Sequence, residues 1–334
     1  MTLKVGVIGA GLIGLEHLDR LAHRIVGSTV SAVFDPVTDR SARAAAAVGA
    51  ITRDTALDLI AAPDVDAVVI ASPGERHAEQ VIACIAAGKP VLCEKPLATT
   101  PDDAQAVLAV ELAAGRRFVQ VGFMRRFDRA YLDVKHALTA GVIGEPLLAH
   151  AVHRNRSVPA TFVGEMALTD SVVHEIDVFR WLFDQEVVAV TVIGVRASPL
   201  GPARLRDPQL VILELANGAV VDVESFVNCQ YGYDVRCEVV GSLGTITMAN
   251  PGTLAVSLDG RRSEPVPDDW RQRFDQAYTD ELQAWVRSSL AGVVEGPSSW
   301  DGYLAVTVAA AAVASYTAGA RVQLPVLDRP ALYA

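Results

Sequence analysis

A lysine in the segment VLCEKPLATT has the surroundings expected of a catalytic group. Lys95 follows a strand predicted over Pro90 to Cys93, and it lies between Glu94 and Pro96. Functional groups of open parallel sheets lie beyond the carboxyl ends of the strands. An ammonium group there can donate a hydrogen bond to a substrate oxygen and stabilise negative charge as it develops. The alternative is a surface lysine paired with Glu94.

An aspartate and a histidine share one face of a helix predicted from Thr169 to Phe183. Asp170 and His174 are four residues apart, so a helix would bring the carboxylate within reach of the imidazole. Such a carboxylate holds a neutral imidazole in one tautomer and makes it a better general base near neutral pH. The core stripe of this helix comprises Val172, Ile176, Phe179 and Phe183. The nearly opposite face comprises Asp170, His174, Asp177 and Trp181, and the alternative is that this face is solvated and the pair fortuitous.

Two further polar clusters follow or end predicted strands. One is Arg125 with Arg126, and the other runs from His153 through Arg154 and Asn155 to Arg156. These side chains could hydrogen-bond a polyol, form an ordinary layer of salt bridges between domains or, for the arginines, bind a phosphorylated substrate.

The N-terminal segment LKVGVIGAGLIG supplies a nucleotide-binding pattern. An apolar strand from Leu3 to Ile8 leads into Gly9, Gly11 and Gly14, which form G-x-G-x-x-G at the start of an amphipathic helix. The first glycine permits the sharp turn, the second lets a pyrophosphate approach the backbone, and the third lets helix pack closely on strand. The phosphates would lie on the helix N-terminus.

A carboxylate at the end of the next strand favours NAD as the ligand. Asp35 ends a strand predicted over Thr29 to Phe34 and lies 21 residues after Gly14, where it can bind the adenosine ribose hydroxyls and repel the extra phosphate of NADP. Arg40 is close enough in sequence to complicate that choice. The residues expected to bind the dinucleotide are Gly9, Gly11, Leu12, Ile13, Asp35, Ser72, Pro73, His77, Glu94 and Lys95.

The alternation of strands and helices positions these residues. Up to residue 122 short apolar runs alternate with helical stretches, which predicts an α/β Rossmann domain with a parallel sheet over residues 1–122. Beyond it, several β-rich runs separated by turns such as Asn217-Gly218 and Asp259-Gly260 predict an α+β domain over residues 123–334. Its open sheet should be large and mostly antiparallel, with helices on one face. Two helices predicted near residues 279–290 and 302–318 complete it.

Composition narrows the class of protein. The chain has 334 residues with 29 basic and 39 acidic side chains, and no basic run long enough to follow a phosphate backbone, so nucleic acid is not expected as a partner. No charge-free apolar stretch reaches membrane-spanning length, and a strand beginning at Leu3 leaves no room for a signal peptide. We therefore expect a cytoplasmic protein. The four cysteines show no C-x-x-C spacing, which favours reduced, buried thiols over disulfides or a metal site, and His17 and His23 are interpreted as solvated or packed residues.

The predicted open sheet of the second domain also indicates that copies of the chain associate with one another. An open sheet of about six strands with apolar residues on both faces needs covering, and the predicted helices are too few to cover both. We expect a homo-oligomer, a symmetric dimer or tetramer.

At Lys95 and beyond, the chain resembles the Gfo/Idh/MocA oxidoreductases and, within that family, the bacterial inositol 2-dehydrogenases. The matching segments, in the family's order, are GAGLIG, Asp35, CEKPLATT, VQVGFMRRFDRAY, GEPL, HRN, DSVVHEIDVFRWL, VNCQYGYD, CEVVG and WDGY, from residue 6 to about 303. Glu94-Lys95-Pro96 is shared widely in the family, whereas GFMRRFD, HRN and VNCQYGYD are narrower and point to the inositol branch.

The resemblance implies an NAD-dependent oxidation of a cyclitol hydroxyl, such as one of myo-inositol, to the ketone without a metal. Lys95, Asp170 and His174 would be the catalytic set: His174 takes the hydroxyl proton, Asp170 orients His174, and Lys95 binds and polarises the reacting oxygen. The residues that would shape the substrate pocket are Lys95, Met124, Arg125, His153, Asn155, Asp170, His174 and Tyr233.

Two segments depart from the inositol branch. SPGERH replaces a turn that usually contains tryptophan, and the loop RSVPATFVGE after Asn155 is particular to this chain. They leave open which polyol is oxidised and at which carbon. The alternatives are another cyclitol, an aminocyclitol precursor or a monosaccharide, with or without a phosphate, and an NAD-binding sensor that has lost catalysis.

Overall fold

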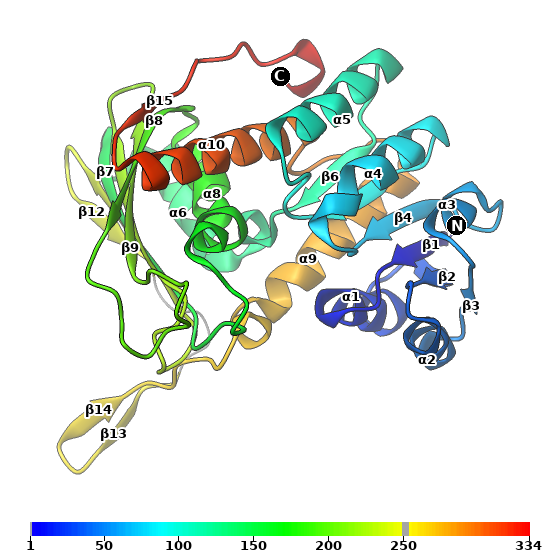
Figure 1. Cartoon of the computed structure of the whole chain (residues 1–334), viewed down its shortest axis with the longest axis horizontal. Helices are drawn as coiled ribbons and strands as arrows, with labels where there is room; N and C mark the ends of the chain where they lie inside the picture. Colours follow the sequence, from blue (N-terminus) through cyan, green and yellow to red (C-terminus); the bar gives the residue numbers. More distant parts are fainter. Residues whose placement is uncertain (1, 249–253) are drawn as a thin grey trace. The chain divides into compact units, whose positions relative to one another are not determined.

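The computed structural model describes residues 2–248 and 254–334 and divides the chain into two compact units. The first contains the residues up to Met124 together with Tyr278–Thr307 and Asp328–Ala334. The second contains Arg125–Ala277 and Val308–Leu327. Figure 1 shows the elements of each unit in sequence colours.

A parallel six-stranded sheet forms the centre of the first unit, with strand order β3-β2-β1-β4-β5-β6. Its strands are β1 (Leu3–Ile8), β2 (Ser28–Phe34), β3 (Ile51–Thr52), β4 (Ala67–Ile70), β5 (Val91–Glu94) and β6 (Val119–Gly122). The helices between them are α1 (Leu12–His23), α2 (Thr38–Val48), α3 (Ala56–Ala61), α4 (His77–Ala86) and α5 (Pro101–Ala114). The chain reverses its direction of travel across the sheet between β1 and β4, and ligands of such sheets bind at that point. The predicted Rossmann domain is confirmed.

Side chains of alternate residues in β1 face opposite layers of this unit. Val5 and Val7 join a core with Leu18 and Leu21 of α1, whereas Gly6 faces Leu59 of α3. A parallel strand covered on both faces is apolar throughout, which is why LKVGVI contains no clear alternation.

The C-terminal helices differ from the predicted division of the chain, which placed them in the second domain. Trp285 of α9 (Trp270–Leu290) is fully buried in the same core as β1, and Glu111 of α5 accepts hydrogen bonds from the hydroxyls of Ser299 and Tyr333. Residues 278–307 and 328–334 therefore complete the first unit, and the unit boundaries fall within α9 and α10 (Ser299–Ala318).

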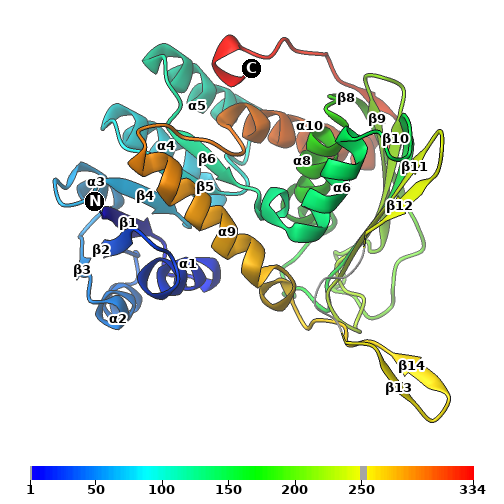
Figure 2. The same ribbon diagram turned by 180° about the vertical axis from the view of Figure 1, so that it is seen from behind.

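A seven-stranded sheet forms the second unit, in the order β12-β11-β7-β10-β9-β8-β15. Its strands are β7 (Pro146–Arg154), β8 (Val187–Gly194), β9 (Gln209–Leu215), β10 (Val220–Phe226), β11 (Asp234–Gly241), β12 (Thr245–Thr247) and β15 (Val322–Gln323). The pair β7 and β10 is parallel and the other neighbouring pairs are antiparallel. Both views place α6 (Arg129–Thr139) and α8 (Val173–Phe183) on the same side of this sheet (Figures 1 and 2), which confirms the predicted architecture.

Two predicted hairpin turns have the backbone geometry that their residues favour. Gly218 has φ +87°, and Asp259 and Gly260 have φ +51° and +72°. Positive φ at both central residues is the signature of a tight type I′ turn, and Asp-Gly tolerates it well. The second turn joins β13 (Val256–Leu258) to β14 (Arg261–Ser263), a hairpin that projects from the rest of the unit (Figure 2).

Among the described residues, no helix combines the length and the apolar character needed to cross a membrane.

Candidate active site

The glycine-rich turn after β1 has one position that is left open and two that are closely packed. A Cβ added to Gly9 would lie 2.4 Å from the Ala71 carbonyl oxygen, and one added to Gly14 would lie 2.0 Å from the Gly9 oxygen. A Cβ added to Gly11 would meet no atom within 4 Å. Gly9 and Gly14 are thus required by the fold itself, whereas the absence of a side chain at Gly11 leaves a clear approach to the backbone.

The N-terminus of α1 offers its amide groups at this open position. Gly11 is the N-cap residue and supplies no capping side chain, and Leu12 is 58% exposed although it is apolar. Uncapped amides and the helix dipole make such an end an anion-binding site. The turn therefore fits the pyrophosphate of a dinucleotide, with Gly11, Leu12 and Ile13 at the predicted place.

Asp35 is held rigidly at the end of β2. Its Oδ2 accepts a hydrogen bond from the Ala10 amide and its Oδ1 one from the Val37 amide, both at 2.9 Å, and Arg40 Nη1 lies 3.4 Å from Oδ2. The carboxylate is 5% exposed. These amides fix its orientation beside the glycine-rich turn, which is the geometry that ribose recognition by a carboxylate needs.

The turns after β4 and β5 hold the other predicted cofactor residues. Ser72 Oγ donates to Gln80 Oε1 at 2.7 Å, and Pro73 leads into the short turn η1 (Gly74–Arg76) before α4. His77 Nε2 lies 2.8 Å from the Ser72 carbonyl oxygen, and its Nδ1 lies 2.7 Å from the Pro96 carbonyl oxygen. His77 thus contacts backbone from both turns.

Lys95 is half-buried directly after β5, and the Lys95–Pro96 peptide bond is cis. The preceding Glu94 is buried and accepts a hydrogen bond from the Lys95 backbone amide at 3.2 Å. Its Oε1 lies 2.7 Å from Nε2 of His17, a fully buried side chain of α1. His17 is therefore a packed partner of Glu94, and His23 is exposed, which are the two environments predicted for these histidines.

A buried ion pair underlies the predicted substrate residues of the second unit. Arg125 and Glu175 are each 1% exposed and hydrogen-bonded to each other, and Glu175 Oε2 lies 2.9 Å from Nδ1 of His153. Burial disfavours both charges, but each stabilises the other, so the pKa of Glu175 is lowered and that of Arg125 is raised. Both members of the pair are therefore ionised. The Glu175 carboxylate also fixes the His153 ring through its contact with Nδ1.

Three aromatic side chains gather at this ion pair. The ring centroid of His153 lies 6.3 Å from that of His174 and 6.0 Å from that of Tyr233. All three are buried, and burial raises the pKa of the Tyr233 phenol. The second unit therefore brings together His153, His174 and Tyr233 beside Arg125; their role as substrate-binding residues stays a prediction. Met124, the last residue of the first unit's N-terminal segment, is also buried.

The segment that carries Asp170 differs from the predicted continuous helix. Residues Ala167–Ser171 form a π-helical turn, in which the Val172 amide donates to the Ala167 carbonyl, and α8 begins at Val173. A π turn contains an extra residue, so the four-residue spacing used to pair Asp170 with His174 does not apply across it. Asp170 is exposed and His174 is buried; their catalytic pairing stays a prediction.

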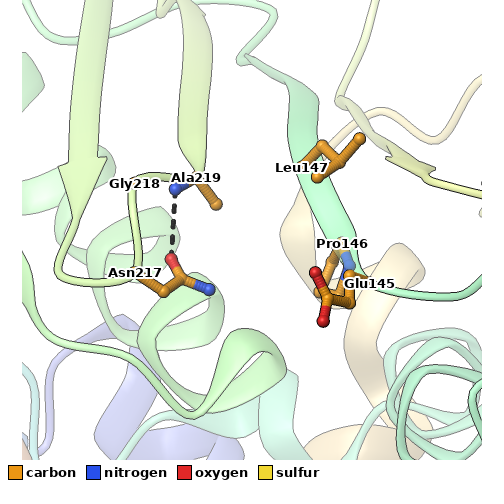
Figure 3. Close-up of a pocket in the computed structure, with 6 residues that line it drawn as sticks. All are labelled: Glu145, Pro146, Leu147, Asn217, Gly218 and Ala219. Carbon is orange, nitrogen blue, oxygen red and sulfur yellow. Dashed lines mark hydrogen bonds between the residues drawn. The ribbon is translucent and has the colours of Figure 1, made fainter.

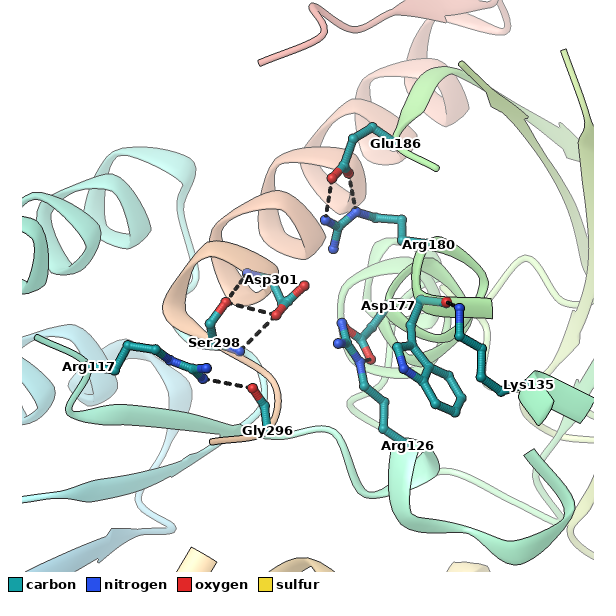
Figure 4. A network of polar contacts seen from close by, with 10 residues as sticks. Arg117, Arg126, Lys135, Asp177, Arg180, Glu186, Gly296, Ser298 and Asp301 are labelled. Atoms are coloured by element: carbon teal, nitrogen blue, oxygen red, sulfur yellow. Dashed lines mark hydrogen bonds and ion pairs between the residues drawn. The ribbon is translucent and has the colours of Figure 1, made fainter. Parts of the chain in front are cut away.

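The alternative interpretation of a solvated helix face does not hold at Asp177 of α8. This carboxylate is 1% exposed and forms two hydrogen bonds with Arg126, at 2.9 and 2.5 Å (Figure 4). Sequence reasoning missed Glu175, and it placed Asp177 on the face opposite the core stripe without identifying Arg126 as its partner. The available signal was the adjacent pair Arg125 and Arg126. These two basic side chains each pair with one of two acids on α8, Glu175 and Asp177.

The second polar cluster divides between the two faces of β7. His153 is buried, whereas Arg154 pairs with Glu224 at 2.7 and 2.6 Å and with Asp234 at 3.3 Å. Successive strand residues point to opposite faces, so HRN could not deliver both side chains to one pocket. Asn155 is half-buried, and its Oδ1 has no hydrogen-bond partner among the described residues.

A separate pocket of about 370 Å³ contains none of the predicted site residues. It is lined by Glu145, Pro146, Leu147, Asn217, Gly218 and Ala219 (Figure 3). All four cysteines are buried and free. Over residues 2–248 and 254–334, no three His, Cys, Asp or Glu side chains are grouped so that they could hold a metal ion.

Comparison with known proteins assigns both parts of the chain. Residues 3–123 match the model of the Gfo/Idh/MocA oxidoreductases that describes their NAD-binding Rossmann fold, and residues 135–324 match the model of their C-terminal α/β domain. The chain belongs to the Gfo/Idh/MocA family.

Full-length relatives in this family share nearly half of the residues. Inositol 2-dehydrogenase 3 of Saccharopolyspora erythraea is 47% identical and covers 100% of this chain and 98% of its own length. Inositol 2-dehydrogenase of Serratia proteamaculans is 45% identical, with 100% and 99% covered.

Solved structures of the family agree in fold. Myo-inositol dehydrogenase from Lactobacillus casei, solved with NAD(H) and myo-inositol, has a TM-score of 0.97 at 36% identity and matches 100% of both chains. Scyllo-inositol dehydrogenase from the same organism, solved with NAD(H) and scyllo-inositol, has a TM-score of 0.88 at 25% identity, with 97% of this chain and 99% of that chain covered. The first unit of this Gfo/Idh/MocA protein is thus an NAD-binding domain, and the enzyme is an oxidoreductase.

Proposed function

We propose that this chain is an NAD-dependent dehydrogenase that oxidises a secondary hydroxyl of a cyclitol, myo-inositol or a close relative, to the ketone. The observation that carries the proposal is the full-length similarity, at 45–49% identity, to inositol 2-dehydrogenases. The similarity to the myo-inositol enzyme of Lactobacillus casei, at 36% identity and a TM-score of 0.97, supports myo-inositol as the first substrate to test.

The catalytic roles are assigned to one residue of the first unit and two of the second. We propose that His174 accepts the hydroxyl proton, that Asp170 orients His174, and that Lys95 donates a hydrogen bond to the reacting oxygen. Bound NAD supplies the hydride acceptor at C4 of its nicotinamide. Because the oxygen gains negative charge as its proton leaves, a fixed ammonium donor stabilises the transition state more than the alcohol.

An uncharged polyol fits the charges of the second unit better than a phosphorylated one. Arg125 is neutralised by Glu175, Arg126 by Asp177, and Arg154 by Glu224. Phosphate recognition by arginine relies on guanidinium groups that can turn toward the ligand. Hydroxyl groups need mixed donors and acceptors instead, and His153, Asn155 and Tyr233 are the side chains assigned to that task.

Asp35 supports preference for NAD over NADP. Its carboxylate oxygens are already oriented by two backbone amides, and Arg40 contacts only one of them at 3.4 Å. A phosphate on the ribose would lie against this negative charge.

We also propose a homo-oligomer in the cytoplasm, a dimer or tetramer built on the outer face of the seven-stranded sheet. Helices α6 and α8 cover one face. Leu148, Val152 and Ile212 alternate along their strands with buried residues, so they face the other side, where they are only half-buried. The free thiols support a reducing compartment. Light scattering tests the assembly, and a monomer at micromolar concentration would contradict it.

A substrate panel tests the catalytic proposal. Inositol isomers, monosaccharides and their phosphates are incubated with NAD and with NADP, and reduced cofactor is followed by absorbance. We expect turnover of myo-inositol or a close relative with NAD; the absence of turnover with every polyol would refute the enzymatic assignment.

Replacing Lys95 with Ala should lower kcat by roughly a hundredfold or more, the usual loss for a removed oxyanion donor. Lys89→Ala is the matched control because Lys89 precedes the same strand and binds the Ala62 carbonyl. A Lys95 variant with activity within a few-fold of the wild type would contradict the assigned role.

A further inference from the structure

Each ring nitrogen of His77 faces a backbone carbonyl oxygen. Both contacts can be hydrogen bonds only if both nitrogens carry a hydrogen. The residue begins α4, its side chain is 1% exposed, and its ring nitrogens lie 2.7 and 2.8 Å from the carbonyl oxygens of Pro96 and Ser72. A carbonyl oxygen carries no hydrogen. A neutral imidazole has one N–H group, so one of these short contacts would place two lone pairs against each other.

We propose that His77 is held as an imidazolium and is a positioning residue for Lys95. This inference rests on the proposed function, because it assigns to His77 an effect on the catalytic lysine of that reaction. The doubly protonated ring donates to both carbonyls and so joins the turn after β4 to the turn after β5. Each charge-assisted hydrogen bond of this kind is roughly twice as strong as a neutral one.

The two carbonyls belong to the segments that matter for the reaction. The Ser72 carbonyl follows β4 at the edge where the cofactor binds, and the Pro96 carbonyl is one residue beyond Lys95. The turns are also packed together: a Cβ added to Gly74 would lie 3.3 Å from Thr99 and 3.5 Å from Pro96. His77 therefore fixes the backbone that carries Lys95 relative to the backbone that lines the cofactor site.

Several charged side chains on the neighbouring elements have partners of their own. Arg76 of η1 contacts Glu79 of α4 at 3.7 Å, and Glu94 of β5 contacts His17. The adjoining segments also carry Glu75, Lys95, Asp102 and Asp103, the last of which binds the Thr100 hydroxyl. The two contacts that define the state of the His77 ring are thus made by backbone dipoles.

Kinetics of His77→Gln test the positioning role. Glutamine cannot span the two carbonyls as the flat ring does, so we expect kcat to fall tenfold or more, while KM for NAD changes less than threefold. The matched control is Gln80→Met, one turn further along α4, which removes the contact to the Ser72 hydroxyl and leaves both carbonyl contacts in place. The control should keep kcat within twofold. Undiminished kcat in His77→Gln, with an active wild type, would overturn the positioning role and leave the proposed function standing.

Neutron diffraction from deuterated wild-type crystals tests the protonation state without any variant. Deuterium on both Nδ1 and Nε2 of His77 near pH 7.5 is the expected result, and deuterium on only one of them would overturn the proposal. This measurement needs no turnover, so a wild type that oxidises no polyol would refute the proposed function while the neutron result still decides the state of His77.

Discussion

Replacing Glu175 with Gln removes the negative charge that makes the buried Arg125 tolerable. Both side chains are 1% exposed, and Glu175 also binds His153. Two unit charges about 4 Å apart at an effective dielectric constant of about 20 attract each other by about 4 kcal/mol. Removal of one partner of a buried pair costs 3–5 kcal/mol in measured cases because the other charge stays buried without compensation. We expect Glu175→Gln to lower the free energy of unfolding by about 4 kcal/mol.

Urea unfolding at one fixed protomer concentration measures this loss, with the fluorescence of Trp181, on the same helix as Glu175, as one reporter. Glu165→Gln is the matched control: Glu165 is exposed in the same unit, and its variant should stay within about 0.5 kcal/mol of the wild type. The double variant Arg125→Met, Glu175→Leu removes both charges and should recover most of the loss. A loss below about 1 kcal/mol in Glu175→Gln, or a double variant as unstable as the single one, would refute the reasoning.

Three further outcomes follow from the described contacts. Gly14→Ala should lower the thermal midpoint, since overpacking of this kind costs about 1–3 kcal/mol, whereas Gly11→Ala should keep the midpoint and weaken NAD binding in calorimetry; equal midpoints for the two variants would contradict the different environments. Burial raises the pKa of Asp207 to about 6 from 3.8, so the folded state keeps this proton longer than the unfolded chain, and about 3 kcal/mol of stability should be lost as pH rises from about 4 to 6. Asp207→Asn should remove that part of the pH dependence of unfolding, and an unchanged slope would show that Asp207 does not cause it. Glu111→Ala, which removes the shared acceptor of two backbone amides and two hydroxyls, should cost about 3 kcal/mol or more in urea unfolding; Glu79→Ala, at an exposed position of α4, serves as its control.

The elements of the first unit were predicted well because the signals for their caps and turns lie in residues that are adjacent in sequence. Thr100 caps α5 by accepting a hydrogen bond from the Asp103 amide at 3.2 Å, and Gly115 ends the helix with φ +71°; threonine and glycine are residue types that favour these two positions. The strand, glycine turn and helix around Gly9 were likewise predicted, because turn geometry depends on neighbours in sequence.

The missed features all depend on partners that are distant in sequence. Periodicity cannot reveal that Trp285 packs beside β1, so it did not group residues 278–307 with the first unit. The π turn before α8 was also not predicted, because the residue types of this segment do not distinguish an i to i+5 hydrogen bond from the i to i+4 bonds of an α-helix. The burial of Asp177 depends on Arg126, 51 residues away, so a carboxylate that looks solvent-facing by pattern is an interior ion pair.

The two arginine–carboxylate pairs of the second unit would make the proposed substrate site both rigid and uncharged overall. Arg125 with Glu175 and Arg126 with Asp177 join one short segment to one helix twice, at neighbouring positions. Each pair cancels its own charge, so a ligand meets oriented hydrogen-bonding groups rather than a net field. A polyol with several equivalent hydroxyls must be held in one orientation for a single carbon to react, and a fixed wall achieves this better than mobile side chains. If His153, Asn155 and Tyr233 bind the substrate as proposed, selectivity rests with these three side chains, and the ion pairs set the rigidity.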